Sequence, residues 1–187
     1  MLTAIETKLM TADEFFDWAN LPENEDRLFE LEDGKVIEMP RPVDIHGVLC
    51  AWVTYLLCAY VDKVGKGLVM SNDTGLLVRK KPDTLRGPDV MFFREALQLT
   101  KRYVIEIPDL VVEVMSPSDR PGRTNKRMQQ YIKRGIPLIW QVDPDDRLIT
   151  VYRGEELSKT FDETDMLTGN GILPGFKCPV SNIFKKI

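Results

Sequence analysis

DLVVEVM (109–115) is the most informative stretch for the fold, because it is a near-continuous apolar run with one carboxylate, Glu113, in its middle. Such runs are typical of strands buried on both faces at the centre of a mixed sheet. On either side of this run, the pattern predicts a strand at 89–93, a helix over 123–134 that ends at a glycine, and a strand at 138–142. Strands interspersed with helices in this order indicate a single sheet of the α/β or α+β class, with the helices outside.

Local signals predict the remaining elements. Thr11-Ala-Asp-Glu14 is a capping box that begins a short helix, and Asp33-Gly34 is the strongest hairpin signal in the chain. The other expected elements are helices over 12–19 and from about 44 to 64, strands at 28–32, 35–39, 68–70, 75–79 and 148–153, loops at 80–88 and 116–122, and one or two weak strands in the tail. A length of 187 residues predicts one domain, 1–187.

Composition narrows the class of protein. The chain is 43% hydrophobic and 29% charged, as expected of a globular domain with a real core. Its one histidine excludes HExxH and histidine-rich metal sites. Cys50 and Cys58 lie about 12 Å apart on a predicted helix, too far for a disulfide, and three sparse cysteines indicate a reducing compartment, the cytoplasm. The apolar run 48–61 is too short for a membrane span, and the N-terminus has no signal-peptide pattern.

Positive charge is concentrated in one stretch of an acidic chain. The net charge is −4 overall, but residues 116–135 carry six basic and one acidic side chain, a net charge of +5. If Met128, Tyr131 and Ile132 define the core face of this helix, Arg127 lies on its flank, one turn before Tyr131. Lys126 then lies nearly opposite the core. We therefore expect Arg127 to lean over the sheet edge and Lys126 to be solvated.

Glu113 is the chemically unusual residue, because a charge inside an apolar strand is costly to bury without a partner. It is paired with an arginine, lies at an exposed strand end, or binds a metal ion. Asp109 is about 13 Å away along the strand and cannot share a small ion with it. Asp89, at the mouth of the neighbouring strand, is a better co-ligand, although an Asp there also caps turns. Two carboxylates on adjacent strands favour Mg²⁺ or Mn²⁺.

Two further residues are candidates with open alternatives. Alternation places Glu30 and Glu32 on one face of a hairpin strand, with Leu31 on the other. A solvated face is the simpler explanation of that pair. His46 either bonds a phosphate or a ligating carboxylate, or is satisfied locally at the start of its helix.

Taken together, these residues resemble the Uma2 family of putative restriction endonucleases, within the PD-(D/E)XK nuclease superfamily. The matching stretches are FELEDGKVIEMPRP (29–42), His46, GPDVMFF (87–93), PDLVVEVMSPSDR (108–120), YIKRGIPLIWQVDP (131–144) and GNGILPGFKCPVSNIF (169–184). They cover most of the chain in the family's order. The resemblance implies a restriction-endonuclease-like fold, a mixed β-sheet core flanked by helices, with an N-terminal helix and β-hairpin.

The resemblance also implies residue roles. Asp89 and Glu113 match the two motif carboxylates, and the backbone carbonyl of Val114 would complete the set of ligands for Mg²⁺ (or Mn²⁺). Glu30 matches the early acidic residue of the family, and His46 matches a histidine that is common in it.

One position departs from the superfamily motif. A lysine is expected two residues after the glutamate, where this chain has Met115. In the family the lysine lies on the next helix, four residues before the tyrosine, and that position is Arg127 here, with Lys126 beside it. An arginine can offset negative charge but is a poor base.

The predicted function is that of a metal-dependent endonuclease that hydrolyses DNA phosphodiester bonds, with Arg127 or Lys126 stabilising the developing charge. The residues expected along the DNA backbone are Arg120, Arg123, Arg79, Lys80, Lys81 and Arg86. Because restriction-like nucleases often cut two strands with two sites, a homodimer is expected. One alternative is a catalytically weak or inactive nuclease-fold protein that binds nucleic acid or a protein partner. Another is a dimeric structural module in which Glu113 pairs with an arginine and holds no metal.

Overall fold

The computed structural model describes residues 9–117, 120–154 and 156–187, and the chain divides into two compact units. Unit 1 comprises the residues up to 41 together with 73–87 and 99–106. Unit 2 comprises residues 42–72, 88–98 and 107–187. Each unit has its own sheet, so they are described in turn, and the single domain expected over 1–187 stays a prediction.

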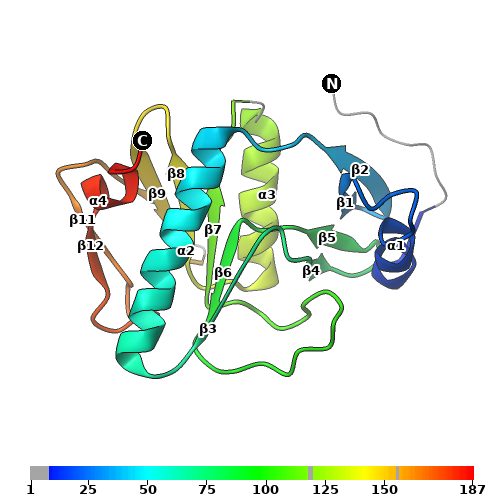
Figure 1. Ribbon diagram of the computed structural model, residues 1–187, viewed down its shortest axis with the longest axis horizontal. Helices are drawn as coiled ribbons and strands as arrows, with labels where there is room; N and C mark the ends of the chain where they lie inside the picture. The colour runs from blue at the N-terminus through cyan, green and yellow to red at the C-terminus, as the bar shows by residue number, and fades with distance from the viewer. Residues whose placement is uncertain (1–8, 118–119, 155) are drawn as a thin grey trace. The chain divides into compact units, whose positions relative to one another are not determined.

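Unit 2 is built on a six-stranded mixed sheet in the order β10-β9-β8-β7-β6-β3 (Figure 1). Its strands are β3 (Leu68–Ser71), β6 (Val90–Phe93), β7 (Leu110–Val114), β8 (Ile139–Asp143), β9 (Leu148–Tyr152) and β10 (Lys159–Phe161). β7 is parallel to β8 and antiparallel to β6, and all five of its residues are buried. The prediction of a strand buried on both faces inside a mixed sheet is therefore confirmed. A separate two-stranded sheet pairs β11 (Met166–Thr168) with β12 (Lys177–Pro179).

Helices cover both faces of this sheet. The helices of unit 2 are α2 (Asp44–Val64), α3 (Pro121–Arg134) and α4 (Val180–Phe184). In Figure 1 the central strands run between α2 and α3. Each long helix ends where predicted, at a glycine with positive φ: Gly65 at 77° and Gly135 at 91°. Only glycine adopts this left-handed cap conformation without strain.

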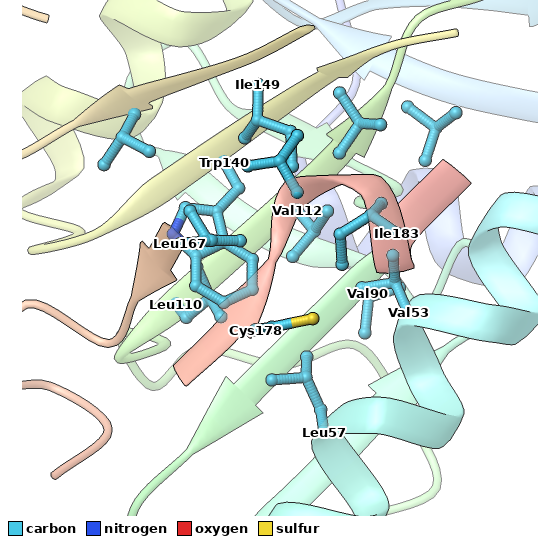
Figure 2. Packing of buried hydrophobic residues seen from close by; sticks show 14 of the residues in the cluster. Val53, Leu57, Val90, Leu110, Val112, Trp140, Ile149, Leu167, Cys178 and Ile183 are labelled. Atoms are coloured by element: carbon cyan, nitrogen blue, oxygen red, sulfur yellow. The ribbon is translucent and has the colours of Figure 1, made fainter. Parts of the chain in front are cut away.

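The core of unit 2 lies between the sheet and α2 with α4. Figure 2 shows Val90, Val112 and Trp140 of the sheet directed toward the same space as Val53 and Leu57 of α2. Leu57 is fully buried, so its truncation to alanine should cost about 2–5 kcal/mol of folding free energy. Alternate residues of β7 face this core, so Val111 and Glu113 face α3 on the opposite side.

By length and composition, α2 is the one helix of the described residues that could cross a membrane. Its Leu49, Val53 and Leu57 are nevertheless buried against the sheet, as expected of a core helix. Its outward face is also apolar, with Val48 and Tyr55 exposed. The helix therefore has one apolar face inside unit 2 and a second directed outward from it.

Unit 1 is a four-stranded antiparallel sheet in the order β2-β1-β5-β4, with one helix. Its elements are α1 (Ala12–Ala19), β1 (Leu28–Glu32), β2 (Lys35–Met39), β4 (Leu76–Arg79) and β5 (Thr84–Arg86). The capping box of Thr11 and Glu14 is present, and the Asp33-Gly34 turn joins β1 and β2 as predicted. A small core forms where Phe15 of α1 packs with buried side chains of the sheet.

Three expectations about the elements need correction. The segment 80–88 is not entirely a loop, because β5 forms there. Three residues are too few to show periodicity, and β5 exists because β1 and β4 pair with it on either side. The helix expected from 123 begins at Pro121, a residue type favoured at the first helical position. The tail forms α4 as well as strands, and part of the expected loop at 116–122, residues 118 and 119, lies outside the described residues.

Candidate functional site

Glu113 is held by two side chains of α3. The Tyr131 hydroxyl donates to Glu113 Oε1 at 2.5 Å, and the Arg127 guanidinium donates to Oε2 at 2.9 Å. Glu113 is only 6% exposed, and Tyr131 is fully buried. The arginine pairing that sequence reasoning left open is therefore present. Because carboxylate oxygens have several acceptor sites, these contacts orient the group without preventing metal coordination.

Asp89 lies at the same end of the sheet as Glu113, against the backbone of the next residue of β7, Val114. The register pairs Val90 with Val112, so Asp89 directly precedes the first paired residue of β6 and Glu113 directly follows its partner on β7. Asp89 Oδ2 accepts the backbone N–H of Val114 at 2.6 Å, and Asp89 is 7% exposed. Because the N–H and C=O of a strand residue point to the same side, the Val114 carbonyl also faces the Asp89 side.

The first turns of α2 bring two more ligand-type side chains to Asp89. His46 Nε2 lies 3.1 Å from Asp89 Oδ1, so His46 contacts a carboxylate, one of its predicted alternatives. Cys50 Sγ lies 3.4 Å from His46 Nδ1 and 4.0 Å from Nε2. Sequence reasoning missed Cys50 and considered it only for a disulfide. The signal was available, because residues four apart on a helix share a face.

Glu30 belongs to a buried ion-pair cluster of unit 1. Its Oε2 accepts from Arg86 at 2.7 Å and its Oε1 accepts from the Gly87 N–H at 3.1 Å, while Glu32 accepts from Arg86 at 2.6 Å. Leu31 points the other way and is fully buried, as alternation predicts. A solvated face, the simpler explanation from the sequence pattern, is wrong for Glu30, which is 4% exposed.

The structure also corrects Arg86. We expected it along a DNA backbone, but it is 3% exposed and both of its terminal nitrogens bond carboxylates of β1. A buried, doubly paired guanidinium cannot reach a phosphate without breaking these bonds. Arg86 therefore organises the sheet of unit 1.

The other predicted cations differ in exposure. Arg127 leans over the sheet to Glu113, and Lys126 is exposed, as the helical phase predicts. Arg120, which precedes the first turn of α3, is exposed, and Arg123 is partly buried.

The remaining expected DNA contacts, all in unit 1 and all exposed, are Arg79, Lys80 and Lys81. Arg79 is paired with Asp33.

Asp109 is at the other end of β7 from this site. It accepts from the Arg94 side chain at 2.6 Å and from the Arg94 backbone N–H at 2.8 Å. It is thus a surface ion-pair residue, in agreement with its exclusion as a co-ligand. Asp109 is therefore a control carboxylate: it lies next to β7 but outside the candidate site.

The donor set fits a hard divalent cation. Asp89 and Glu113 offer buried carboxylate oxygens at the same end of the sheet, and the Val114 carbonyl is directed to the Asp89 side. Oxygen ligands of this kind are the ones that Mg²⁺ and Mn²⁺ prefer. His46 and Cys50 add softer donors next to Asp89, and their three ligand atoms lie within 4.8 Å of one another.

A mixed sheet with two buried carboxylates at the ends of adjacent central strands, flanked by helices, defines a restriction-endonuclease-like fold. The chain belongs to the Uma2 family, described as putative restriction endonuclease, whose family model matches residues 12–181. This match confirms the family resemblance inferred from the motifs, and it spans both units.

A solved structure supports the same fold. The crystal structure of a putative nuclease belonging to DUF820 from Anabaena variabilis superposes with a TM-score of 0.78 and 21% sequence identity. The match covers 94% of this chain and 98% of that one. At this identity the likeness shows the shared fold. Among curated proteins, no sequence matches the chain.

Proposed function

We propose that the protein is a metal-dependent endonuclease that hydrolyses DNA phosphodiester bonds. The observation that carries this proposal is a pair of buried carboxylates at one end of the sheet: Glu113 on β7, and Asp89, which precedes β6 and accepts the N–H of Val114. With the Val114 carbonyl they would hold Mg²⁺ or Mn²⁺. When bound, such an ion supplies a water of lowered pKa and polarises the phosphoryl oxygen.

Side chains around the carboxylates would prepare them for this role. The Tyr131 hydroxyl fixes one oxygen of Glu113, and the Val114 N–H fixes one oxygen of Asp89. His46 contacts the other Asp89 oxygen and so restrains its rotation. Such outer contacts orient metal ligands and raise metal affinity. Arg127 supplies positive charge toward a phosphate, but it stays protonated and cannot take a proton from water. Lys126 is the second candidate for that charge.

The amino-terminal part of α3 supports a phosphate-binding role. Its first turn contains no acidic residue and begins beside Arg120 and Arg123. The positive end of the helix dipole adds to these charges. We propose that they, with Lys80 and Lys81, contact the DNA backbone. The role of Glu30 as a further ligand rests on the family resemblance and stays a prediction.

Supercoiled plasmid nicking tests the nuclease proposal. Wild type should nick plasmid in Mg²⁺ or Mn²⁺, and Glu113→Gln should lose nearly all activity while keeping its fold. Asp109→Asn, which removes a carboxylate charge from the same strand outside the site, should keep the activity. Equal cleavage by wild type and Glu113→Gln would contradict the assignment of Glu113.

A specific observation favours the alternative, a nuclease-fold protein that binds nucleic acid without cutting it. Arg127 neutralises Glu113 directly, at the position where the family has a lysine. This reading predicts DNA binding without cleavage of plasmid, linear duplex or single strands in either metal. Each lost phosphate contact, as in Arg120→Ala, should reduce the slope of log K against log salt by about 0.9.

We also propose a homodimer that associates through the outward face of α2. Ile45, Val48 and Tyr55 form an exposed apolar row along this helix. The first turn of α2 contains the acidic Asp44 and its last turn contains the basic Lys63. Antiparallel pairing of two copies of α2 would therefore place Asp44 of each copy near Lys63 of the other. Light scattering should give a dimer mass for wild type and a monomer mass for Tyr55→Glu. A monomeric wild type at micromolar concentration would exclude this dimer.

The proposal also includes the domain organisation of the chain and its location in the cell. We propose that 1–187 acts as one nuclease domain, because the family model spans parts of both units. We also propose a cytoplasmic location, which the three free cysteines support.

A further inference from the structure

We propose that His46, Cys50 and Asp89 form a thiolate-containing site for a softer divalent metal, Zn²⁺, which competes with Mg²⁺ or Mn²⁺ for Asp89. The site itself requires only the geometry at the start of α2. Its consequence, inhibition by zinc, rests on the proposed nuclease function.

The three ligand atoms lie close enough together to surround a single zinc ion. With Zn–S of about 2.3 Å and Zn–N or Zn–O of about 2.0–2.1 Å, neighbouring ligand atoms should be about 3.3–3.6 Å apart. Here His46 Nε2 is 3.1 Å from Asp89 Oδ1 and 4.0 Å from Cys50 Sγ. All three atoms lie within 4.8 Å of one another. The His46–Asp89 and His46–Cys50 separations lie within about 0.5 Å of the tetrahedral values, which side-chain rotation can adjust.

Rigid elements hold these three side chains. His46 and Cys50 are four residues apart on α2, so they present their side chains one above the other on one face. The Val114 N–H fixes Asp89 from the strand side. Cys50 also packs against the core of unit 2. A site whose ligands are already placed loses little conformational entropy on binding metal.

The donor types select the metal. A thiolate and an imidazole favour Zn²⁺ over Mg²⁺, which prefers oxygen ligands. Three protein ligands leave a fourth position for water or for another group. Binding requires the Cys50 thiol to release its proton to solvent and the imidazole to be neutral, so that sulfur and nitrogen each donate a lone pair.

The proposed zinc site and the proposed Mg²⁺ site both require Asp89, so the two ions would compete. An ion bound by Cys50, His46 and Asp89 Oδ1 occupies a carboxylate that the proposed Mg²⁺ site also needs. Zinc exceeds magnesium in affinity for nitrogen and sulfur ligands, so excess Mg²⁺ should not readily displace it. Zinc in the presence of Mg²⁺ should therefore inhibit cleavage, and Cys50→Ser should relieve that inhibition.

Cobalt absorption tests the site without any nuclease assay. Full-length, untagged protein is titrated with Co²⁺, a spectroscopic substitute for Zn²⁺, and thiolate-to-cobalt charge-transfer absorption is measured. Wild type should show this band, and Zn²⁺ should abolish it by displacement. Cys50→Ser should lose the band and bind Co²⁺ at least about tenfold more weakly. A band that is absent from wild type, or that persists in Cys50→Ser, would overturn the proposal.

The other two cysteines are matched controls. Cys58 is exposed on the same helix, and Cys178 is buried elsewhere in unit 2. Neither residue belongs to the cluster of His46, Cys50 and Asp89, and desolvation, together with Asp62 for Cys58, raises the pKa of both thiols. Cys58→Ser and Cys178→Ser should therefore keep the band.

Alkylation of the wild-type protein gives a second measurement that requires no variant to fold. Iodoacetamide labelling followed by mass spectrometry should show that Zn²⁺ protects Cys50 and leaves the labelling of Cys58 unchanged. Equal labelling of Cys50 with and without Zn²⁺ would overturn the proposal. Because neither measurement involves DNA, an inactive protein that binds cobalt through Cys50 would contradict only the nuclease proposal.

Discussion

The hydroxyl of Tyr131 is the most direct test of how Glu113 is held. Tyr131→Phe removes one oxygen atom and leaves the buried ring in place, so packing is unchanged. The lost bond is 2.5 Å long and joins a hydroxyl to a buried carboxylate. Hydrogen bonds to charged groups contribute about 1.5–3 kcal/mol, so unfolding free energy should fall by that amount. For a chain of 187 residues this lowers Tm by about 3–12 °C.

A double-mutant cycle with Glu113→Gln isolates the charge. In the Gln background the same hydroxyl meets a neutral acceptor, where the bond is worth about 0.5–1.5 kcal/mol. Tyr131→Phe should therefore cost about 1–1.5 kcal/mol less in that background than in wild type. Denaturant unfolding with EDTA measures all four proteins without metal.

Tyr152→Phe is the matched control for this cycle. Tyr152 donates to Gln141 Oε1 at 2.7 Å, a neutral acceptor, so its substitution should cost only about 0.5–1.5 kcal/mol. If Tyr131→Phe lowers the unfolding free energy equally in both backgrounds, the prediction is wrong. That result would mean that the charge of Glu113 does not strengthen the hydrogen bond from the hydroxyl.

Three further predictions concern other parts of the chain. Arg86→Leu should lower the unfolding free energy by about 3–5 kcal/mol in a denaturant titration, because it leaves two carboxylates of β1 without their buried cation; a cost below about 1 kcal/mol would contradict this. Burial, helped by the hydrogen bond to Asp13, raises the pKa of Tyr103 to about 12. Its stabilising contribution should thus be complete below pH 10 and be lost as pH rises through 12, and the tyrosinate absorbance of wild type minus Tyr103→Phe should titrate near 12 rather than 10. A Cβ on Gly169 would lie 2.2 Å from the Leu173 carbonyl oxygen, whereas one on Gly47 meets nothing within 4 Å. Gly169→Ala should therefore lower Tm, and Gly47→Ala, inside α2, should raise it by a stabilisation of about 0.5–1 kcal/mol; the same sign for both would be the contrary result.

Local interactions made most elements predictable from the sequence. The capping box at Thr11, the Asp33-Gly34 turn and the glycines after α2 and α3 act within a few residues, so their patterns predict element ends closely. β5 escaped because it depends on pairing with β1 and β4, which come from other segments of the chain. α4 escaped because five residues are too few to show a helical period.

The candidate site was predictable in its residue types and partly in its contacts. A charge in the apolar strand β7 marked Glu113, and helical phase placed Arg127 on the side of the sheet. The sequence pattern assigned Tyr131 only to the core and missed its bond to Glu113. The pattern shows that a tyrosine is buried, but it does not show which group its hydroxyl bonds. It also placed Arg86 at the surface, because an arginine in a polar, proline-containing segment has no local signal of burial.

The amino-acid sequence specifies the chemistry available at this site: two acids near apolar strands, one histidine, one cysteine a turn later, and a basic helix. Which of these groups meet depends on the three-dimensional packing of the chain. Asp89 reaches Val114, the residue after Glu113, because β6 pairs with β7 in one particular register, and His46 reaches Asp89 because α2 begins beside it. Periodicity along one segment carries no information about register or helix placement, since both depend on the packing of segments far apart in the chain.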